Sequence, residues 1–511
     1  MKTLRLKPVL QLRNIFIRTI AVEASAINET DSSHLKSWRE IPGPSSLPII
    51  GQLRHFLPGG ELYNLSSLEL GERLYNKYGP IVRLDGILGS APLITLFEPE
   101  SSAFVLRSEN RMPIRTGFES LAYYRKKHGR AVSKESMSLG LLTDHGESWK
   151  EFRSTVNPVL LQPKTIKLYT SLIDEVAQDM IVRLRHLRGD DNTIKGDLEM
   201  EMNLWSLESI ALVALGCRLN CFRDDLPSDS PEKKLIRSVR DVFKLADKLD
   251  FKPSLWRYYP TKTFKQAMKL YEELDLLAKY FMDKTIEELE KQGTRKSDDE
   301  KSVLEKLLEI NKDVALIMAS DVLFAGVDTT SNTVLATLYL LAVNQEKQDK
   351  LREEIFARTD PTEKLPYLRA CIKESMRMLP ITAGNIRKTT KEYNLHGYKI
   401  PEGMQITFMH QVMSMMEKHY PRPKEFLPER WLLKKDDPLY HGATHPFVNQ
   451  PFGFGVRSCI GRRIAELELE TFLMRLMQNF RVEWFGPPVG VKSASLNYIV
   501  GPYNYIFKDI S

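Results

Sequence analysis

Apolar residues recur every three or four positions along much of the chain, a spacing that predicts helices with one buried face. Residues 233–249 and 263–291 are predicted to be amphipathic helices of this kind. Residues 69–78 and 365–377 are also predicted to be helices, and residues 203–219 a strongly apolar one. A further helix is predicted to begin near Ile460, because apolar positions follow at the same spacing: Ala465, Leu469, Phe472, Leu476 and Phe480. Helix is therefore the dominant structure expected of this chain.

Residues 314–342 form a long apolar segment in which Asp321 and Asp328 are the only charged side chains. Its length alone would allow it to cross a membrane. However, the polar run from Asp328 to Thr333 lies at its centre, where lipid would make those groups costly. The segment is better explained as a long helix that is buried on all sides.

Shorter patterns predict small sheets between these helices. Residues 81–84 and 93–97 are expected to be strands, and residues 395–404 are expected to form a hairpin. Residues 112–142 are irregular and contain Pro and Gly, which predicts a long loop. Taken together, the patterns predict a mainly α fold with small β-sheets.

Residues 250–260 interrupt the helical pattern and concentrate Trp and Tyr beside Lys and Arg. That composition suits a membrane interface, and an ordinary aromatic loop fits it equally well. Residues 292–301 are polar and charged, and we expect an exposed loop there rather than a domain linker.

The first 22 residues carry five basic side chains and no acidic one. This basic, amphipathic composition is typical of a mitochondrial presequence, and a frayed basic terminus is the alternative. Apolar runs in this segment are too short for a spanning helix. We therefore predict a presequence and flexible lead over residues 1–37, and a single catalytic domain over residues 38–511.

Composition places the chain of 511 residues among ordinary globular proteins, with 42% hydrophobic and 27% charged residues. The net charge of +7 suits an acidic partner or a membrane surface. Nucleic acid is not expected as a partner, because no basic segment is interleaved with aromatic residues. A disulfide framework is not expected either, because the four cysteines are few and scattered: Cys217, Cys221, Cys371 and Cys459.

Candidate chemistry centres on Cys459, which lies in a glycine-rich loop directly before the predicted C-terminal helix. A helix N-terminus is expected to lower the pKa of a thiol. Gly453 and Gly455 let the backbone approach a flat ligand, and Arg457 could bind a carboxylate or phosphate. Two alternatives are a buried apolar cysteine and a phosphate-binding loop, although no Gly-Lys-Ser/Thr follows.

The loop matches F-x-x-G-x-R-x-C-x-G and resembles the haem-binding loop of the cytochrome P-450 family, the haem-thiolate monooxygenases. Other stretches are similar to further motifs of the family in the same order, namely Trp149/Arg153, residues 325–330, Glu374/Arg377 and residues 426–431. The likeness covers roughly residue 38 to the C-terminus. It is strongest to the mitochondrial branch, in residues 371–377 and 461–468, and to insect members associated with xenobiotic and insecticide oxidation.

This resemblance implies haem b bound between the long central helix and the cysteine loop, with Cys459 as the thiolate ligand of iron. Residues expected to hold the haem are Trp149, Arg153, Arg387, Phe452, Arg457 and Gly461. On the oxygen side, Asp328 and Thr329 are expected to relay protons to O2. The Thr329 hydroxyl could bond a carbonyl one turn back, and Gly326 would leave room for a ligand.

Glu374 and Arg377, taken alone, would be an ordinary surface ion pair. In the family such a pair joins a second arginine, here Arg430, in a buried network that fixes the cysteine loop. We therefore expect a structural role for these three residues rather than a catalytic one.

The resemblance also implies a hydrophobic small-molecule substrate, with electrons passing from NADPH through ferredoxin reductase to an acidic 2Fe–2S ferredoxin. A basic patch on the cysteine side would receive this partner, although a solvated basic face is the alternative: Arg369, Lys373, Arg462 and Arg463. The expected location is the matrix side of the mitochondrial inner membrane, peripherally bound. Rival functions are a haem-thiolate isomerase or dehydratase and a non-catalytic haem or hydrophobic-ligand binder.

Overall fold

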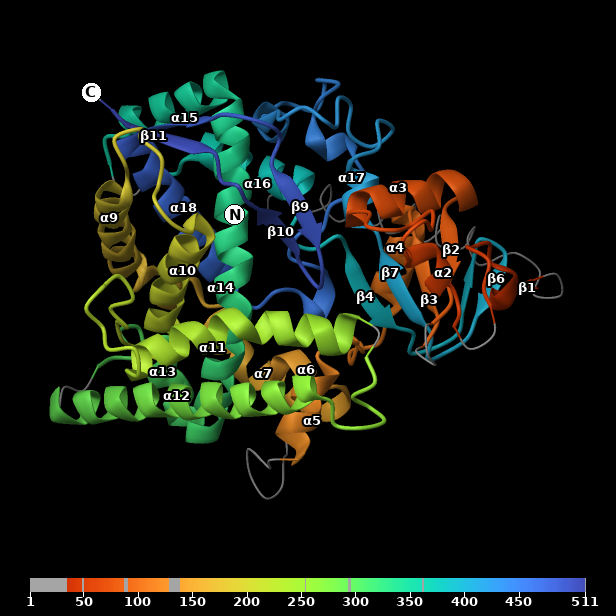
Figure 1. Cartoon of the computed structure of the whole chain (residues 1–511), viewed down its shortest axis with the longest axis horizontal. Coiled ribbons are helices and arrows are strands. Elements are labelled where there is room, and N and C mark those ends of the chain that lie inside the picture. The colour runs from red at the N-terminus through yellow and green to blue at the C-terminus, as the bar shows by residue number, and fades with distance from the viewer. Residues whose placement is uncertain are drawn as a thin grey trace, which may run out of the picture.

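The computed structural model describes residues 35–47, 50–86, 91–127, 138–252, 254–292, 296–360 and 363–510. Helices make up one side of the molecule and the larger sheet lies on the other (Figure 1). This arrangement confirms the predicted mainly α fold with small sheets. Most of the proposed presequence, residues 1–37, lies outside the described residues.

The central element is α14 (Lys312–Val343), which runs through the middle of the helical side (Figure 1). Asn311 caps its N-terminus by accepting a hydrogen bond from the amide of Asp313. The helices α10 (Leu198–Ala214), α16 (Pro366–Met378) and α18 (Arg462–Asn479) pack around it. Within the described residues, α14 is the one helix long and apolar enough to cross a membrane, and 78% of its most apolar window is buried. The burial confirms the predicted core helix.

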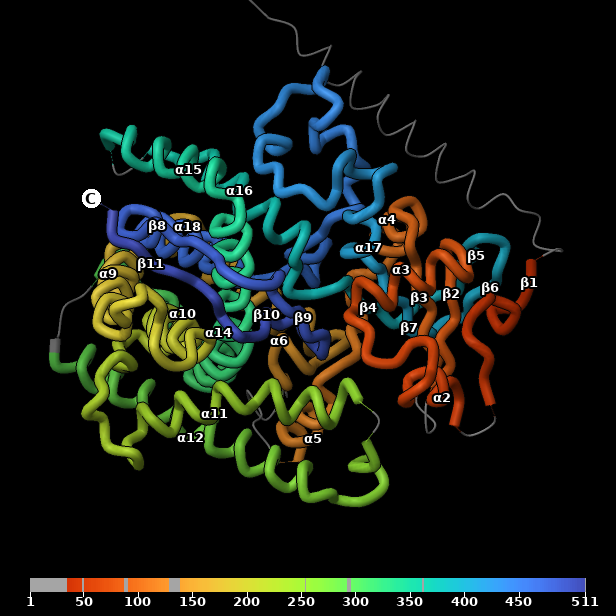
Figure 2. The backbone as a smooth tube through the Cα atoms, turned by 45° about the horizontal axis from the view of Figure 1, so that its top comes forward, coloured from red at the N-terminus to blue at the C-terminus, as the bar shows by residue number. Residues whose placement is uncertain are grey.

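A pair of helices covers one end of α14, as both views show (Figures 1 and 2). These are α11 (Pro231–Ala246) and α12 (Lys262–Gln292), and a π-helical turn, η3 (Asp247–Phe251), extends α11. Pro253 is outside the described residues, and the helical pattern is broken after η3 as the sequence predicts. Helix α12 and the turn η3 lie against α5 (Glu119–Lys127).

The larger sheet has the strand order β2-β3-β7-β4, formed by β2 (Ile81–Leu84), β3 (Leu93–Leu96), β7 (Gln405–Phe408) and β4 (Asn385–Lys388). Strands β4 and β7 are antiparallel, with Arg387 opposite Ile406. This register places Arg387 at the sheet edge that leads toward the cysteine loop. Ile94, Leu96, Ile406 and Phe408 are fully buried, so the sheet has its own apolar core.

Three small sheets complete the β structure: β1 (Lys36–Ser37) with β6 (Tyr398–Ile400) and β5 (Tyr393–Leu395), β9 (Gly490–Ser493) with β10 (Asn497–Val500), and β8 (Phe480–Trp484) with β11 (Tyr505–Asp509). The β5–β6 pair is a hairpin over residues 393–400, so the hairpin predicted over residues 395–404 was present but placed too late in the chain. The remaining helices and turns are η2 (Trp38–Glu40), α2 (Leu53–Phe56), α3 (Ser67–Tyr78), α4 (Pro99–Ser108), α6 (Gly140–Thr143), α7 (Gly146–Leu160), α8 (Pro163–Lys167), α9 (Thr170–Leu187), α13 (Val303–Ile310), α15 (Gln345–Ala357), α17 (His410–Ser414), η4 (Pro428–Trp431), η5 (His441–Ala443) and η6 (Gly455–Arg457).

Three expectations from the sequence were wrong in detail. The segment 112–142, expected to be a loop, contains α5 and α6. The helix expected over 203–219 is α10, which begins five residues earlier because Asp197 caps it and Arg183 pairs with the buried carboxylate of Glu201. Phe480, expected in the last helix, is the first residue of β8, where its side chain is fully buried.

Candidate functional site

A backbone hydrogen bond within the cysteine loop, residues 452–461, closes the loop. The amide of Cys459 donates to the carbonyl of Phe452 at 2.8 Å, which closes the loop across seven residues of sequence. Gly453 and Gly455 take φ values of +70° and +69°, a conformation that a residue with a side chain adopts only with strain. The short helix η6 follows, and α18 begins after Gly461. The loop thus presents Cys459 just before the N-terminus of a long helix.

Part of the surface of Cys459 is accessible to solvent. Many protein atoms nevertheless surround its thiol group. Burial raises the pKa of the Cys459 thiol, and the amide of Gly461 with Arg153, Arg115 and Arg462 offsets that rise only in part. The expected net lowering of the Cys459 pKa was therefore wrong, because desolvation outweighs the Gly461 amide and the nearby positive groups. A bound metal would reverse the balance, since its charge deprotonates a coordinating thiol.

Arg457 lies buried in the centre of the site. Its guanidinium donates to the carbonyls of Pro113 at 3.0 Å, Leu141 at 3.1 Å and Asp144 at 2.7 Å. It also stacks on the Trp149 ring, with 3.7 Å between the guanidinium carbon and the ring centroid. Burial and neighbouring arginines lower the pKa of Arg457 to about 8. Trp149 is thus brought to the site as the partner of this arginine.

Arg153, one turn after Trp149 on α7, reaches the same loop. Its guanidinium donates to the carbonyl of Ser458 at 3.0 Å, directly beside Cys459. Its Nε is buried without a hydrogen-bond partner among the described residues. Burial lowers the pKa of Arg153 to about 10, while the negative form of Cys459 acts in the opposite direction. A buried donor without a partner is costly, which indicates that a ligand atom completes this site.

Arg387 and Arg115 approach the loop from the sheet. Arg387 pairs with Glu109 at 2.9 Å, and its guanidinium also donates to the carbonyl of Phe454 at 3.4 Å. Arg115 lies next to it because Ile114 pairs with Lys388 in a β-bridge. Burial, and then the positive charge of Arg387, lower the pKa of Arg115. Sequence reasoning missed Arg115 and Glu109, since neither belongs to a local motif.

In the middle of α14, between residues 321 and 330, the partly exposed positions lie on one face of the helix. Val322, Ala325, Gly326 and Thr329 keep partial exposure, whereas the neighbouring positions are buried. Their spacing of three and four residues places them together on one side. The Thr329 hydroxyl donates to the carbonyl of Ala325 at 2.8 Å, one turn back, as the sequence predicted. A small ligand could therefore contact α14 along this face.

Gly326 also has a packing role that the sequence did not indicate. A Cβ at this position would lie 2.8 Å from Cγ1 of Ile210, on the neighbouring helix α10. The missing side chain therefore allows the close approach of α10 and α14. Ser206 of α10 strengthens the same contact by donating to the carbonyl of Gly326 at 3.3 Å.

Asp328 is buried, and its carboxylate accepts a hydrogen bond from the Tyr498 hydroxyl at 3.4 Å. Burial is the main reason that the pKa of Asp328 rises to about 7. Glu199 raises this pKa further, while Lys244 and Tyr498 act in the opposite direction. A carboxyl group with a pKa near neutrality can both take up and release a proton at physiological pH.

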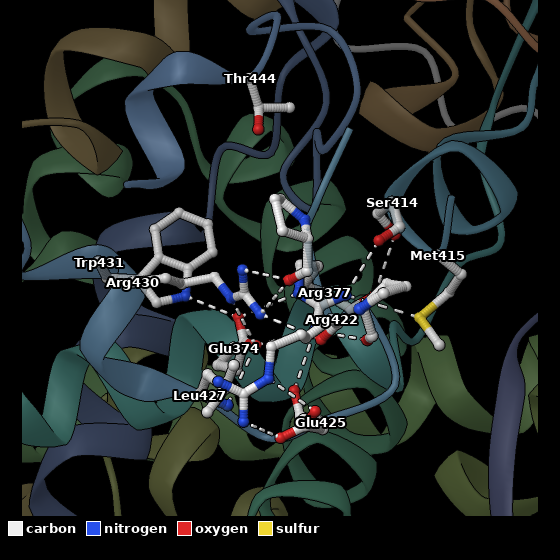
Figure 3. Close-up of polar contacts among 12 residues, drawn as sticks. Glu374, Arg377, Ser414, Met415, Arg422, Glu425, Leu427, Arg430, Trp431 and Thr444 are labelled. Atoms are coloured by element: carbon white, nitrogen blue, oxygen red, sulfur yellow. Dashed lines mark hydrogen bonds and ion pairs between the residues drawn. The ribbon is translucent and has the colours of Figure 1, made fainter. Parts of the chain in front are cut away.

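Glu374, Arg377 and Arg430 form one fully buried network (Figure 3). Arg377 pairs with the Glu374 carboxylate through two hydrogen bonds, at 3.0 and 2.8 Å, and Arg430 joins at 2.9 Å. The Trp431 indole donates to the same carboxylate at 2.9 Å. The carboxylate therefore has a donor for each of its oxygens, the condition under which a buried charge is tolerated.

The two arginines bind the chain that leads to the cysteine loop. Arg377 donates to the carbonyls of Ser414 at 2.9 Å and Pro423 at 2.8 Å. Arg430 donates to the carbonyl of Pro421 at 3.2 Å. The segment between α17 and η4 is thereby fastened to α16 by side chains rather than by regular secondary structure.

Comparison with known proteins places these features in a family. The family model "Cytochrome P450" matches residues 41–495. Cytochrome P450 CYP12A2 of Musca domestica is 39% identical over 499 residues, covering 93% of this chain and 92% of that protein. "Probable cytochrome P450 12b2, mitochondrial" of Drosophila melanogaster is 38% identical, covering 88% and 85%. The chain belongs to the cytochrome P450 family.

The fold agrees with this membership. The crystal structure of the cytochrome P450DA heme domain superposes with a TM-score of 0.71 at 18% identity, covering 93% of this chain and 98% of that one. Members of the cytochrome P450 family are haem-dependent monooxygenases, so haem is the cofactor of this chain.

The residues around Cys459 fit a haem. The propionate groups of haem are anionic, and Arg115, Arg153, Arg387 and Arg457 bring four buried or half-buried cations to the site against the carboxylate of Glu109. Burial is the main cause of the lowered pKa values of Arg115, Arg153 and Arg457, and repulsion from neighbouring arginines lowers them further. Bound propionates would supply negative charge and a partner for the Arg153 Nε.

The basic patch on the cysteine side of this P450 is partly neutralised. Arg369 pairs with Glu470 through two hydrogen bonds, at 2.7 and 2.9 Å, and Arg462 pairs with Glu466 at 2.8 Å. The remaining members are Lys373, which lies over the Trp431 ring at 5.7 Å, and Arg463, which is exposed. Arg462 also lies over the Phe452 ring, at 5.2 Å, so the patch adjoins the loop.

Proposed function

We propose that this P450 inserts one oxygen atom of O2 into a hydrophobic small molecule, using electrons that pass from NADPH through ferredoxin reductase and an acidic 2Fe–2S ferredoxin. A xenobiotic such as an insecticide, or a steroid-like hormone, is the proposed substrate class. The arrangement of Cys459 within a ring of arginines is the observation that carries the proposal.

Cys459 is the proposed ligand of the haem iron. Phe452 and Gly461 shape the loop around it, and Trp149, Arg153, Arg387 and Arg457 would hold the propionates. When bound, the haem supplies the activation of O2, while the protein supplies position and electrostatics. The network of Glu374, Arg377 and Arg430 would keep the loop in place.

Asp328 and Thr329 are the proposed proton-handling residues. The pKa of Asp328, about 7, allows its carboxyl group to exchange protons at neutral pH. The Thr329 hydroxyl, on the accessible face of α14, donates a hydrogen bond to the carbonyl of Ala325. Its oxygen therefore remains an acceptor toward that face, where it can receive a hydrogen bond from a bound ligand.

A hydrophobic substrate is supported by the aromatic side chains near α14. The Phe118 ring lies 5.2 Å from the rings of both Phe251 and Phe324, and 5.9 Å from that of Phe243. These four rings come from the segment before α5, from η3, from α14 and from α11. This aromatic cluster makes the surroundings of α14 apolar, and apolar surroundings suit a hydrophobic ligand.

A mitochondrial location is proposed from the names of relatives, several of which are described as mitochondrial. Peripheral binding to the matrix side of the inner membrane is supported by exposed apolar residues in and after η3, which are 42 to 73% exposed: Phe251, Leu255, Tyr258 and Tyr259. Residues 1–37 would be the presequence and residues 38–511 the catalytic domain.

The direct test is to reconstitute the purified protein with NADPH, ferredoxin reductase and a mitochondrial ferredoxin. We expect the carbon monoxide spectrum of a haem thiolate, and oxidised products that carry label from isotopic O2. Panels of steroids and insecticides would then be compared by displacement of the water on iron. Conversion without NADPH would instead indicate an isomerase or dehydratase, and binding without conversion would indicate a ligand-binding protein.

Charge reversal of Lys373 is expected to weaken the electron donor's binding. Lys373→Glu should raise the apparent KM for ferredoxin several-fold while the KM for substrate stays unchanged, because donor docking is electrostatic. Steady-state turnover at varied ferredoxin and salt concentrations measures this effect. Lys265→Glu, an exposed change on α12, is the matched control. An unchanged ferredoxin KM in Lys373→Glu would remove this residue from the docking surface.

A further inference from the structure

Asp328 of α14 accepts a hydrogen bond from a hydroxyl group on a strand that is distant in the sequence. The Thr329 hydroxyl donates to a backbone carbonyl of its own helix, while the Asp328 carboxylate accepts from Tyr498 on β10. Residue 498 lies 170 positions after Asp328 in the chain. The side chain that holds Asp328 is thus separate from the motif to which Asp328 belongs.

Strand β10 is firmly attached to α14, so this contact has a fixed geometry. The Ile499 amide donates to the Asn332 side chain at 3.2 Å, and Asn332 in turn donates to the Asp328 carbonyl at 2.9 Å. A little further along, the Tyr505 hydroxyl donates to the carbonyl of Leu335 at 2.9 Å. Tyr498 therefore approaches Asp328 from a rigid support.

A second acid–tyrosine pair lies beside the first. The Tyr503 hydroxyl donates to Glu199 of α10 at 3.1 Å and also contacts the carbonyl of Ile499 at 2.8 Å. Glu199 is half-buried, and burial raises its pKa. Its charge acts directly on Asp328. Two carboxyl groups therefore share one region between α10, α14 and β10.

Cations and a further acid complete the electrostatic surroundings. Lys244 of α11 lowers the pKa of both Asp328 and Glu199, and Lys492, opposite Tyr498 in the β9–β10 pair, lowers that of Glu199. Burial, and then the charges of Asp328 and of Asp247 on η3, raise the pKa of Tyr498. The groups that act on Asp328 thus come from α10, α11 and β10, and those that act on its neighbours Glu199 and Tyr498 include side chains of β9 and η3. None of these elements belongs to the motif of Asp328.

We propose that Tyr498 and Glu199 are positioning residues that set the protonation state and the orientation of the Asp328 carboxyl group. Tyr498 stabilises the charged carboxylate and holds it toward β10. Glu199 opposes that charge and favours the protonated form. The inference rests on the proposed proton-handling role of Asp328, and it adds two residues on which that role would depend.

The two residues should shift the titration of Asp328 in opposite directions. Tyr498→Phe removes a donor to the carboxylate, so the pKa of Asp328 should rise. Glu199→Gln removes a neighbouring negative charge, so the pKa should fall. We expect shifts of roughly one pH unit, a typical size for a single polar neighbour in a folded protein. Opposite signs would not arise from general loosening of the site.

Infrared spectroscopy of the carboxyl band tests the proposal without turnover. Subtracting the spectrum of Asp328→Asn assigns the band of Asp328, whose titration is then followed in the haem-loaded protein. Tyr505→Phe is the matched control, because its hydroxyl also bonds α14 but contacts a backbone carbonyl. We expect an unchanged midpoint in this control. The proposal is overturned if Tyr498→Phe and Glu199→Gln leave the midpoint in place or move it in the same direction.

A second measurement separates this inference from the proposed function. If the protein oxidises substrate, the pH at which product formation per NADPH consumed is half-maximal should move with the infrared midpoint in each variant. Opposite infrared shifts without any change in this coupling would support the electrostatic arrangement but contradict the role of Asp328 in proton delivery. If the infrared midpoint of Asp328 does not shift in Tyr498→Phe or Glu199→Gln while the protein oxidises substrate normally, the inference is contradicted and the proposed function is not.

Discussion

Cys459→Ala is expected to abolish oxidation completely and to remove the thiolate signature from the carbon monoxide spectrum of the reduced protein. The side chain would no longer supply an iron ligand, whereas the arginines that hold the propionates would remain. Some haem should therefore still bind, with a spectrum typical of a weaker or different axial ligand. Absorption spectroscopy and haem content per polypeptide measure both effects.

Cys217→Ser provides the matched control, because Cys217 is a partly buried cysteine on the loop after α10. Its haem content, spectrum and turnover should match those of the unmodified protein. Retention of the thiolate spectrum in Cys459→Ala would contradict the assignment of this residue. Haem loading should also weaken steadily as the pH falls anywhere below the raised pKa of Cys459, because the iron must displace the thiol proton over that whole range.

Glu374→Gln is expected to cost about 3–5 kcal/mol of stability, the range found when one partner of a buried ion pair is removed. Arg377 and Arg430 would lose their shared carboxylate while both remain fully buried. Because these arginines fasten the segment before the cysteine loop, haem retention should fall together with the midpoint of thermal unfolding. Calorimetry and the rate of haem transfer to an acceptor protein would report the two losses.

A surface pair in the same segment supplies the comparison. Arg422 and Glu425 form a 2.7 Å hydrogen bond, yet both side chains are about half exposed. Glu425→Gln should cost about 0–1 kcal/mol, since solvent screens an exposed pair. Equal destabilisation by both substitutions would show that the buried network has no special role in stability.

Features of the fold that depend on local pattern were predictable from the sequence. The apolar positions of residues 314–342 run all round the helix, and the observed α14 extends only two residues before and one residue beyond that range. The short helix α5 was missed because residues distant in the sequence stabilise it. Ser120 bonds Asp250 at 2.6 Å, and Arg125 pairs with Asp321 at 2.7 Å. Neither contact leaves a periodic signal in residues 112–142.

The residues of the candidate site also fall into those that local motifs reveal and those that only tertiary contacts bring in. Cys459, Arg457 and Glu374 lie in short motifs, so the amino-acid sequence alone identifies them as candidates. Arg115 and Tyr498 have no such motif, because each reaches the site only through strand pairing or docking of a distant hairpin. The partial neutralisation of the basic patch was missed for a related reason. Glu470 meets Arg369 only when α16 and α18 pack together.

The cluster of arginines has a consequence for how the protein matures. Without the propionates, the guanidinium groups near Cys459 repel one another and, within the described part of the chain, only Arg387 has an ion-pair partner in Glu109, so the haem-free chain should be markedly less stable than the loaded one. Binding of the cofactor to the folded state alone adds stability in proportion to the logarithm of its free concentration. The amount of enzyme that accumulates in a cell would then follow the supply of haem, and a shortage would leave chains open to proteolysis.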